Sequence, residues 1–136
     1  MAPELLPAVV FVISSFIAFS TGTSWGTFAI MLAISIPMAN IHDANLTIVV
    51  AATLGGGIFG DHCSPISDTS IISSMASASD HIDHVKTQLP YALVVGSISI
   101  LMLILATLKL PFLVILATGI ILSYLFIKFL AKPVES

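Results

Sequence analysis

Charged side chains are scarce in this sequence. Only 8% of its 136 residues are Asp, Glu, Lys or Arg, whereas 57% are hydrophobic and the mean hydropathy is +1.13. A soluble domain carries about 25% charged residues because its surface faces water. The composition therefore predicts a protein that is surrounded largely by lipid, and it argues against a soluble enzyme.

Arginine is absent, and cysteine occurs once. The four basic residues are all lysines, so the chain has no basic patch to hold nucleic-acid phosphates, and we expect no nucleic-acid partner. The single Cys63 excludes an internal disulfide. The first residues also lack the positive region of a signal peptide. The chain becomes apolar at Leu5, which favours the end portion of a longer protein or one half of a two-chain assembly.

Two long apolar segments near the end of the chain are typical of membrane-spanning helices. Residues 89–108 contain no charged side chain, and about 20 helical residues cross a hydrocarbon core of about 30 Å. Residues 110–130 form a second such segment, with Lys128 near its far end, where a lysine reaches the head groups. We predict an all-α integral membrane protein of one domain, residues 1–136, with two ordinary transmembrane helices here.

The first apolar segment is interrupted by small polar residues. Residues 5–20 are apolar, but as a helix they are shorter than a full crossing. Residues 21–26 are rich in hydroxyl groups and glycine, and residues 27–39 are apolar again. We predict a re-entrant hairpin over residues 5–40. Two short tilted spans joined by an ordinary turn are the alternative.

The next segment, residues 45–79, is too long for one helix across a bilayer. As a continuous helix it would extend about 52 Å. A run of three glycines at 55–57 loosens a helix, and Pro65 removes a backbone donor. We predict a transmembrane helix broken near mid-membrane, with residues 60–69 unwound. Exposed backbone at that depth is tolerated only inside protein or beside water.

The lysines orient the predicted helices. Lys86, Lys128 and Lys132 fall on one side of the membrane and Lys109 on the other. The side with the excess is cytoplasmic by the positive-inside rule. Residues 80–88 are then a cytoplasmic linker, and the C-terminus is cytoplasmic.

Two carboxylates lie inside the predicted broken helix. Asp61 and Asp68 are the only acidic residues in an apolar segment, and a charge in the bilayer core costs roughly 2.5–3.5 kcal/mol or more, so it marks a functional site. Neighbouring oxygen groups suit a hard cation such as Na⁺, and unwound carbonyls complete such a shell. The residues of the break predicted to bind ions and protons are Asp61, Asp68, Ser64, Ser67 and Thr69.

These carboxylates suit exchange of Na⁺ for H⁺. Burial favours the protonated carboxyl group and a bound cation favours the charged form, so the two ions compete for one negative site. Two nearby carboxylates would titrate as a coupled pair. The alternative for Asp68 is a capping role at the start of the second half-helix.

Hydroxyl groups crowd the predicted hairpin tip as well. Half-helix ends around such a tip hold ions through carbonyls or N–H groups. The alternative is that the hydroxyls satisfy backbone groups in a tight turn. The predicted ligands of the tip are Ser20, Thr21, Thr23 and Ser24, and the residues predicted to shape tip and break are Gly22, Gly26, Gly60 and Pro65.

Histidines near the break are candidates for pH-responsive groups, because the ordinary histidine pKa is about 6.5. They are His62, His81 and His84. Asp80 and Asp83 alternate with the last two, which would also suit zinc, although a solvated surface at the membrane edge is the simpler interpretation. Cys63 beside His62 is not favoured as a nucleophile, since adjacent residues rarely orient each other for that chemistry.

Five polar strings within residues 20–91 are unusual in so apolar a sequence. They are residues 20–27 (STGTSWGT), 60–69 (GDHCSPISDT), 73–75 (SSM), 80–85 (DHIDHV) and 87–91 (TQLPY). Together they resemble the NhaC-type Na⁺/H⁺ antiporters. The resemblance implies sodium-coupled secondary transport in the cytoplasmic membrane of a prokaryote. It also implies the ion-transporter superfamily fold, of which this chain resembles the C-terminal part, a partial second inverted repeat.

We therefore expect Na⁺/H⁺ antiport with Na⁺ held at Asp61 and Asp68, and no cofactor. The expected partners are lipid, the two ions, and either a companion chain carrying the first repeat or further copies in a homo-oligomer. The alternatives are coupled exchange of an organic anion, of the malate–lactate type, or of an amino acid, and a non-transporting fragment. An anion would rely on backbone N–H groups and hydroxyls, because no lysine lies in the tip or the break.

Overall fold

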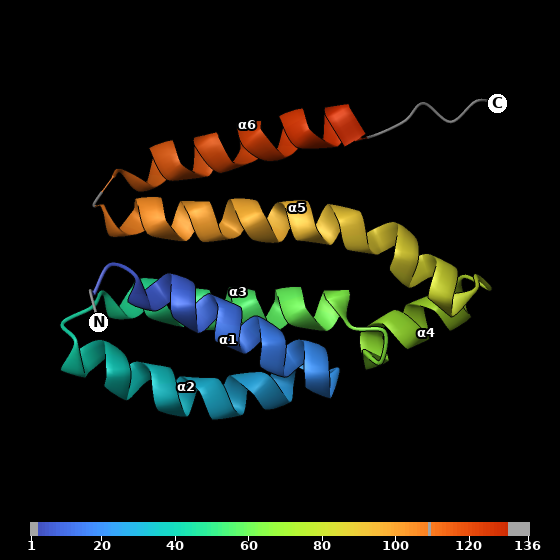
Figure 1. The fold of residues 1–136 in the computed structure, drawn as a ribbon, viewed down its shortest axis with the longest axis horizontal. Helices are drawn as coiled ribbons and strands as arrows, with labels where there is room; N and C mark the ends of the chain where they lie inside the picture. The colour runs from blue at the N-terminus through green and yellow to red at the C-terminus, as the bar shows by residue number, and fades with distance from the viewer. Residues whose placement is uncertain (1–2, 109, 131–136) are drawn as a thin grey trace.

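Six helices make up most of the computed structural model, which describes residues 3–108 and 110–130 (Figure 1). No strand occurs within these residues. The predicted all-α fold class is confirmed. The helices are α1 (Leu6–Thr21), α2 (Ser24–Ile41), α3 (Leu46–Cys63), α4 (Asp68–Ala76), α5 (His81–Thr107) and α6 (Phe112–Leu130).

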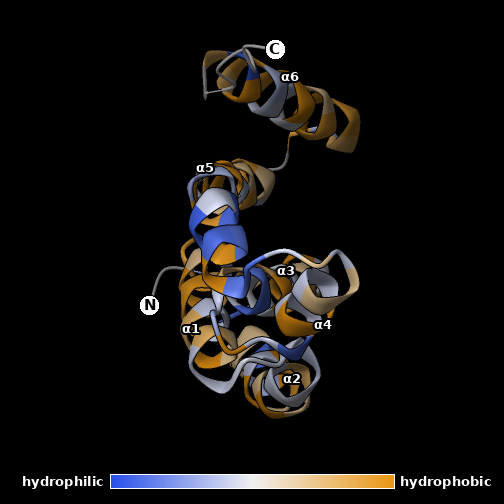
Figure 2. Cartoon of the chain, turned by 90° about the vertical axis from the view of Figure 1, so that its right-hand side faces the viewer, coloured by the Kyte–Doolittle hydropathy of each residue, from blue (hydrophilic) through white to orange (hydrophobic). Residues whose placement is uncertain are grey.

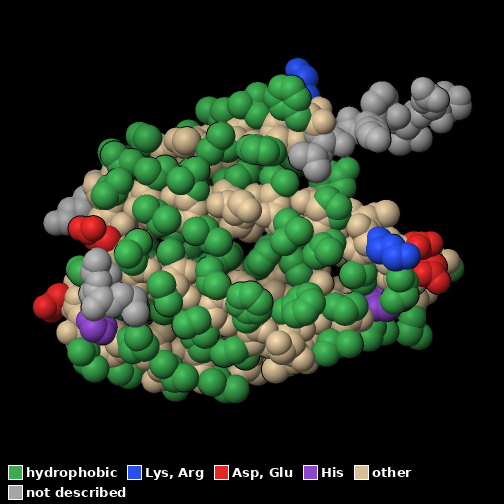
Figure 3. Space-filling model, in the orientation of Figure 1, with side chains coloured by type: hydrophobic (Ala, Val, Ile, Leu, Met, Phe, Trp, Pro, Cys, Tyr) green, Lys and Arg blue, Asp and Glu red, His purple; other side chains and the backbone are tan. Residues whose placement is uncertain are grey.

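Four of these helices, α2, α3, α5 and α6, are long and apolar enough to cross a membrane, and α1 is a shorter apolar helix. Large hydrophobic side chains are exposed along them. Hydrophobic residues dominate the helices in Figure 2, and in Figure 3 charged groups gather at the two ends of an apolar face. Such a surface suits lipid rather than water. The sidedness derived from lysines stays a prediction, and Lys109 and Lys132 lie outside the described residues.

The turn between α1 and α2 is shorter than predicted. Gly22 ends α1 with a left-handed φ of 67°, and its N–H donates to the carbonyl of Ala18 at 2.8 Å. Thr23 is extended and α2 begins at Ser24, so Gly26 belongs to a helix rather than to the tip. A glycine in the left-handed region reverses the chain within two residues, which removes the need for a six-residue tip. Whether the hairpin re-enters the membrane stays a prediction.

The glycine-rich part of α3 packs tightly against α1 and does not unwind. A Cβ atom on Gly56 would overlap the backbone of Phe11, and one on Gly60 would overlap the carbonyl of Ser15. The helix continues through both glycines to Cys63. The prediction that the glycines loosen the helix and that Gly60 breaks it is therefore wrong. Two glycines four residues apart instead allow close backbone approach, as at other helix crossings in membranes.

The predicted interruption lies slightly later, at residues 64–67 (Figure 1). Asn45 caps the start of α3 by accepting the N–H of Ile48 at 3.2 Å. Ser67 caps the start of α4 by accepting the N–H of Ser70 at 3.4 Å. An interruption is thus present between α3 and α4, and we call residues 64–67 the break. Its position near mid-membrane stays a prediction, because α3 alone is long enough to cross a membrane.

Helix α5 packs against α1 and α3, and α6 lies on the far side of α5 from this group (Figures 1 and 2). Within the described residues, α6 contacts α5 and no other helix. Residues 81–88, predicted as a linker, form the first two turns of α5. Asp80 caps this helix, because its Oδ1 accepts the N–H groups of Ile82 and Asp83 at 2.9 and 3.0 Å. Because Asp80 caps the helix, α5 begins at His81, before the apolar span at residue 89. The hydropathy pattern alone does not indicate this earlier start.

Candidate functional site

Asp61 is the buried carboxylate of the described chain. It lies in the last turn of α3 and is 2% exposed. The Ser67 hydroxyl donates to its Oδ1 at 2.7 Å, and the Thr69 hydroxyl lies 3.5 Å from its Oδ2. Asp61 therefore connects the end of α3 to the start of α4 across the break.

The hydroxyl groups of Ser67 and Thr69 lie next to each other beside the Asp61 carboxylate. Their oxygens lie 2.8 Å apart, and Ser67 is fully buried while Thr69 is exposed. Ser67 donates its one proton to Asp61, so Thr69 donates either to Ser67 or to Asp61. The geometry places two hydroxyl oxygens and two carboxylate oxygens together, all of which are hard ligands that suit Na⁺.

The break packs against the end of α1. The Ser64 hydroxyl donates to the carbonyl of Phe19 at 2.8 Å and accepts the N–H of Ile66 at 3.3 Å. A Cβ atom on Gly22 would lie only 2.5 Å from the carbonyl oxygen of Ile66. The structure thus brings the α1–α2 turn and the break into contact, although their separation in the sequence is about 45 residues.

Asp68 occupies a different environment from Asp61. It is exposed, and its Oδ1 accepts the N–H of Thr69 at 2.8 Å. It is the first residue of α4, and the cap one residue earlier is Ser67. An acidic residue in the first turn is favourable to the helix dipole. The capping role that was the alternative for Asp68 therefore belongs to Ser67, one residue earlier.

Hydroxyls of the tip donate to their own helices. Ser20 donates to the carbonyl of Phe16 at 2.8 Å, and Thr21 to that of Ile17 at 2.9 Å. Thr23 and Ser24 are half-buried, and Thr27, buried in α2, donates to the Thr23 carbonyl at 2.9 Å. In the described part of the chain none of these hydroxyls bonds to Asp61. The structure brings the turn to the break, but it does not bring these hydroxyls to the carboxylate.

The three candidate histidines separate into two groups. His62 is exposed and lines an apolar groove. His81 contacts the carbonyl of Pro65, and both His81 and His84 contact the hydroxyl of Ser74. Among residues 3–108 and 110–130, no three His, Cys, Asp or Glu side chains converge to hold a metal ion. Sequence reasoning gave no role to Ser74, although its spacing of four from Ser70 places both on one face of α4.

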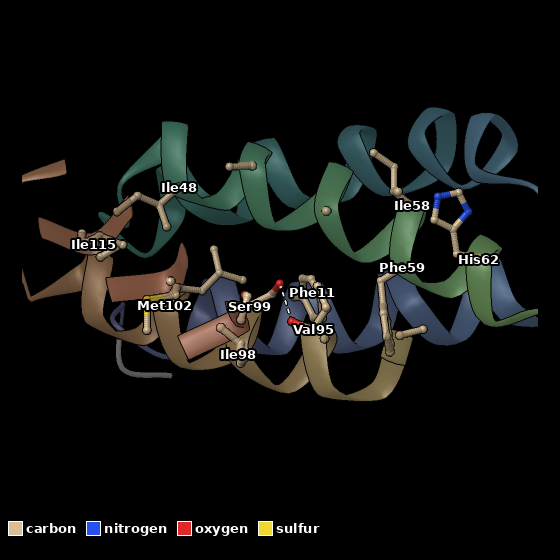
Figure 4. A pocket seen from close by; sticks show the side chains of 18 of the residues that line it. Phe11, Ile48, Ile58, Phe59, His62, Val95, Ile98, Ser99, Met102 and Ile115 are labelled. Carbon is tan, nitrogen blue, oxygen red and sulfur yellow. Dashed lines mark hydrogen bonds between the residues drawn. The ribbon is translucent and has the colours of Figure 1, made fainter. Parts of the chain in front are cut away.

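A large apolar groove lies away from the carboxylate. It has a volume of about 870 Å³ and runs between α3, α5 and α6 (Figure 4). Figure 4 shows apolar side chains such as Phe59 and Met102 along it, with His62 at one end. No carboxylate lines it. Size alone would point to this groove, but the polar chemistry lies at Asp61.

These features define a multi-pass membrane protein with a buried acidic site where a helix is interrupted. The family model described as "Na+/H+ antiporter family" matches residues 1–108. The chain belongs to the Na⁺/H⁺ antiporter family.

Three of the relatives of this chain come from two bacteria. An uncharacterized protein of Haemophilus influenzae is 52% identical over 95 residues, 69% of this chain and 18% of the relative. An uncharacterized Na⁺/H⁺ antiporter of the same organism is 34% identical over 62% of this chain and 18% of the relative. A malate-2H⁺/Na⁺-lactate antiporter of Bacillus subtilis is 33% identical over 64% of this chain and 19% of the relative. The chain thus spans about a fifth of the length of these relatives, and no solved structure matches it.

Proposed function

We propose that this chain takes part in Na⁺/H⁺ antiport across the cytoplasmic membrane of a prokaryote, with Asp61 as the carboxylate that the two ions share. The observation that carries the proposal is the burial of Asp61 at the break, where, among the described residues, its carboxylate oxygens bond only to the hydroxyls of Ser67 and Thr69. No lysine or histidine neutralises it in the described residues. A buried carboxylate without a fixed cationic partner needs a mobile cation or a proton.

The exchange follows from competition for Asp61. When Na⁺ is bound, the carboxylate is charged, and the hydroxyls of Ser67 and Thr69 turn their oxygens towards the ion. When Na⁺ leaves, a proton from the other phase neutralises the carboxyl group, since an empty charged site in this environment is costly. Asp68, exposed one residue beyond the break, is the proposed second carboxylate, which attracts the cation from water.

Exchange of an organic anion is the second candidate, because one relative is a malate-2H⁺/Na⁺-lactate antiporter. The start of α4 is the natural site for an anion, since the first N–H groups of a helix have no partner among the preceding turns of that helix. However, the Ser67 hydroxyl occupies the Ser70 N–H, and Asp68 places a negative charge in the same turn. The site therefore favours a cation. An anion would need cationic groups from the remainder of a longer transporter or from a companion chain.

Antiport in everted membrane vesicles tests the proposal. We expect added Na⁺ to dissipate an imposed pH gradient. We expect Asp61→Asn to abolish this response, because the asparagine amide carries no charge and takes up no proton. Ser67→Ala should raise the Na⁺ concentration needed for half-maximal response, because one ligand is lost. Asp68→Asn, a change of the same size in an exposed position, should retain exchange with weaker Na⁺ dependence. Full activity in Asp61→Asn would refute the assignment.

The same assay separates the candidate substrates. A response to Na⁺ alone supports Na⁺/H⁺ antiport, and a response that appears only with malate or lactate supports anion exchange. Reconstitution of the purified chain, alone and with membranes that supply other chains, tests whether a companion or a homo-oligomer is required. Absence of any flux in both preparations would favour a non-transporting fragment.

A further inference from the structure

The groove between α3, α5 and α6 has one polar end (Figure 4). Helices α3 and α5 run antiparallel, and a Cβ atom on Gly96 of α5 would overlap the ring of Phe59 on α3. Closer to the break than this contact, His62 of α3 and both Gln88 and Tyr91 of α5 line the groove. Three side chains that can donate hydrogen bonds therefore lie at the same end of the groove.

The remainder of the groove is apolar. Its lining there consists of hydrophobic side chains and glycine, apart from the hydroxyl groups of Thr47, Ser99 and Ser123. The hydroxyl of Ser99 donates to a carbonyl of its own helix at 2.9 Å. Among the described residues, no lysine and no carboxylate lines the groove. An apolar groove with hydrogen-bond donors at one end is complementary to an amphiphilic molecule.

The donors at the polar end are not used inside the described part of the chain. No hydrogen bond joins the side chain of His62, Gln88 or Tyr91 to another group there, whereas Thr87 nearby donates to carbonyls of α5. His62 and Tyr91 are exposed, and Gln88 is half-buried. An imidazole N–H, an amide NH₂ and a phenol O–H all donate to oxygen acceptors. Such donors suit a phosphate group, because a charged acceptor makes stronger hydrogen bonds than a neutral one.

The length of the groove matches one leaflet of a bilayer. Along α3, the rise from Ile48 to His62 is about 21 Å. A bilayer with its head groups is about 40–45 Å thick, and a phospholipid in one leaflet extends over about half of this. A helix that crosses the hydrocarbon core needs about 30 Å. The exposed pair of Asp83 and Lys86 precedes Gln88 on α5, and charged side chains at a helix end are typical of the head-group region.

We propose that this groove binds one phospholipid, whose phosphate accepts hydrogen bonds from His62, Gln88 and Tyr91 and whose acyl chain lies along α3. The groove volume of about 870 Å³ is in the range of sites that enclose one small ligand. In the described residues α6 contacts α5 alone, so an acyl chain in the groove also joins α6 to α3. The site does not depend on which ions the chain carries, and it does not rest on the proposed function.

Native mass spectrometry of the full chain in a mild detergent measures the site. Dioleoyl-phosphatidylglycerol is the probe, because its head group carries a phosphate and no cationic group. Dioleoylglycerol has the same acyl chains without the phosphate, and glycerol 3-phosphate has the phosphate without the chains. The fraction of the chain with one bound molecule is followed as each compound is added. Circular dichroism checks that every variant keeps its helix content.

Two matched pairs of variants locate the site. Tyr91→Phe removes only a hydroxyl from the polar end, and Tyr124→Phe makes the same change on α6 outside the groove. Ala51→Trp places a large ring in the apolar part of the groove. Ala117→Trp places the same ring at a position on α6 that is equally exposed and does not line the groove.

We expect the natural chain to bind one phosphatidylglycerol at least tenfold more tightly than dioleoylglycerol, and to show no binding of glycerol 3-phosphate. Tyr91→Phe should weaken phosphatidylglycerol binding about tenfold, the effect of one hydrogen bond to a charged group, and leave dioleoylglycerol binding unchanged. Ala51→Trp should abolish the binding of both lipids. Tyr124→Phe and Ala117→Trp should bind both lipids as the natural chain does.

Three results would overturn the proposal. The first is equal affinity for phosphatidylglycerol and dioleoylglycerol in the natural chain, or equal affinity for phosphatidylglycerol in all five proteins. The second is a lipid-free dimer that Ala51→Trp dissociates, which would place a second copy of the chain in the groove. The third is another membrane protein that co-purifies in equal amount with the lipid-free natural chain but not with Ala51→Trp, which would place a helix of a companion chain there.

Discussion

Replacing Gly60 by alanine tests the helix crossing that supports the site. A Cβ atom there would overlap the Ser15 carbonyl and lie 2.9 Å from the Cβ of Ala18, whereas ordinary contacts begin at 3.4 Å. The obstacle is backbone, so α1 and α3 must separate by about half an ångström or more. Overpacking of this kind costs about 1–3 kcal/mol, and the better helix propensity of alanine offsets about 1 kcal/mol. Separation of α1 from α3 would also strain the bond between Ser64 and Phe19.

Gly55→Ala is the matched control for this prediction. Its added Cβ would meet the Phe11 ring at 3.5 Å, an ordinary contact, and it gains the same helix propensity. The difference in stability between the two variants therefore isolates the overlap, which we expect to be about 1–3 kcal/mol. The stability of both variants is measured by thermal unfolding in detergent, in which the reaction of the buried Cys63 with a fluorogenic maleimide reports the unfolded fraction. Equal unfolding midpoints would refute the close crossing at Gly60.

Three further variants test other parts of the fold by the same unfolding assay. Thr53→Val removes the 2.9 Å bond to Ser35 and should cost about 1–3 kcal/mol, and adding Ser35→Ala should restore part of the loss; no restoration would contradict the pairing. Gly22→Ala should cost about 1–3 kcal/mol, because its φ of 67° and the nearby Ile66 carbonyl both disfavour a side chain; unchanged stability would contradict the turn geometry. Ser64→Ala should cost about 1 kcal/mol and weaken Na⁺ dependence in the vesicle assay, and an unaltered response would contradict its role in holding the break.

Several features could be predicted because they depend on composition and segment length. The scarcity of charge led to the all-helical membrane fold, and the excessive length of residues 45–79 led to the interruption between α3 and α4. Hydropathy could not locate the interruption, since glycine is compatible with both a loosened helix and a tight crossing. A pair of glycines spaced by four, Gly56 and Gly60, was the available signal for a crossing. The local pattern also fits a flexible helix, and only the contacts of Gly56 with Phe11 and of Gly60 with Ser15 distinguish the two.

The clustering of polar residues was predicted but its arrangement was not, and the role of these residues in ion binding stays a prediction. Asp61, Ser67 and Thr69 meet as the clustering of polar residues suggested. The sequence gives Asp61 and Asp68 the same chemistry, yet one is buried and the other exposed. The difference arises because Asp61 ends a helix packed against α1, whereas Asp68 begins a helix beyond the break. Capping of α5 by Asp80 likewise turned a predicted linker into helix.

The sequence by itself determined that the chain is a membrane protein, and it led to the prediction of an ion site between residues 60 and 69, because the cost of placing charge in lipid does not depend on the fold. Only the tertiary structure decided which carboxylate is enclosed and that His81 contacts Pro65, 16 residues away. The tertiary structure also decided that the α1–α2 turn contacts the break. These relations depend on how closely α1 approaches α3 and on where the capping residues Ser67 and Asp80 start the next helices. Such contacts join groups that are distant in sequence, so no local pattern specifies them.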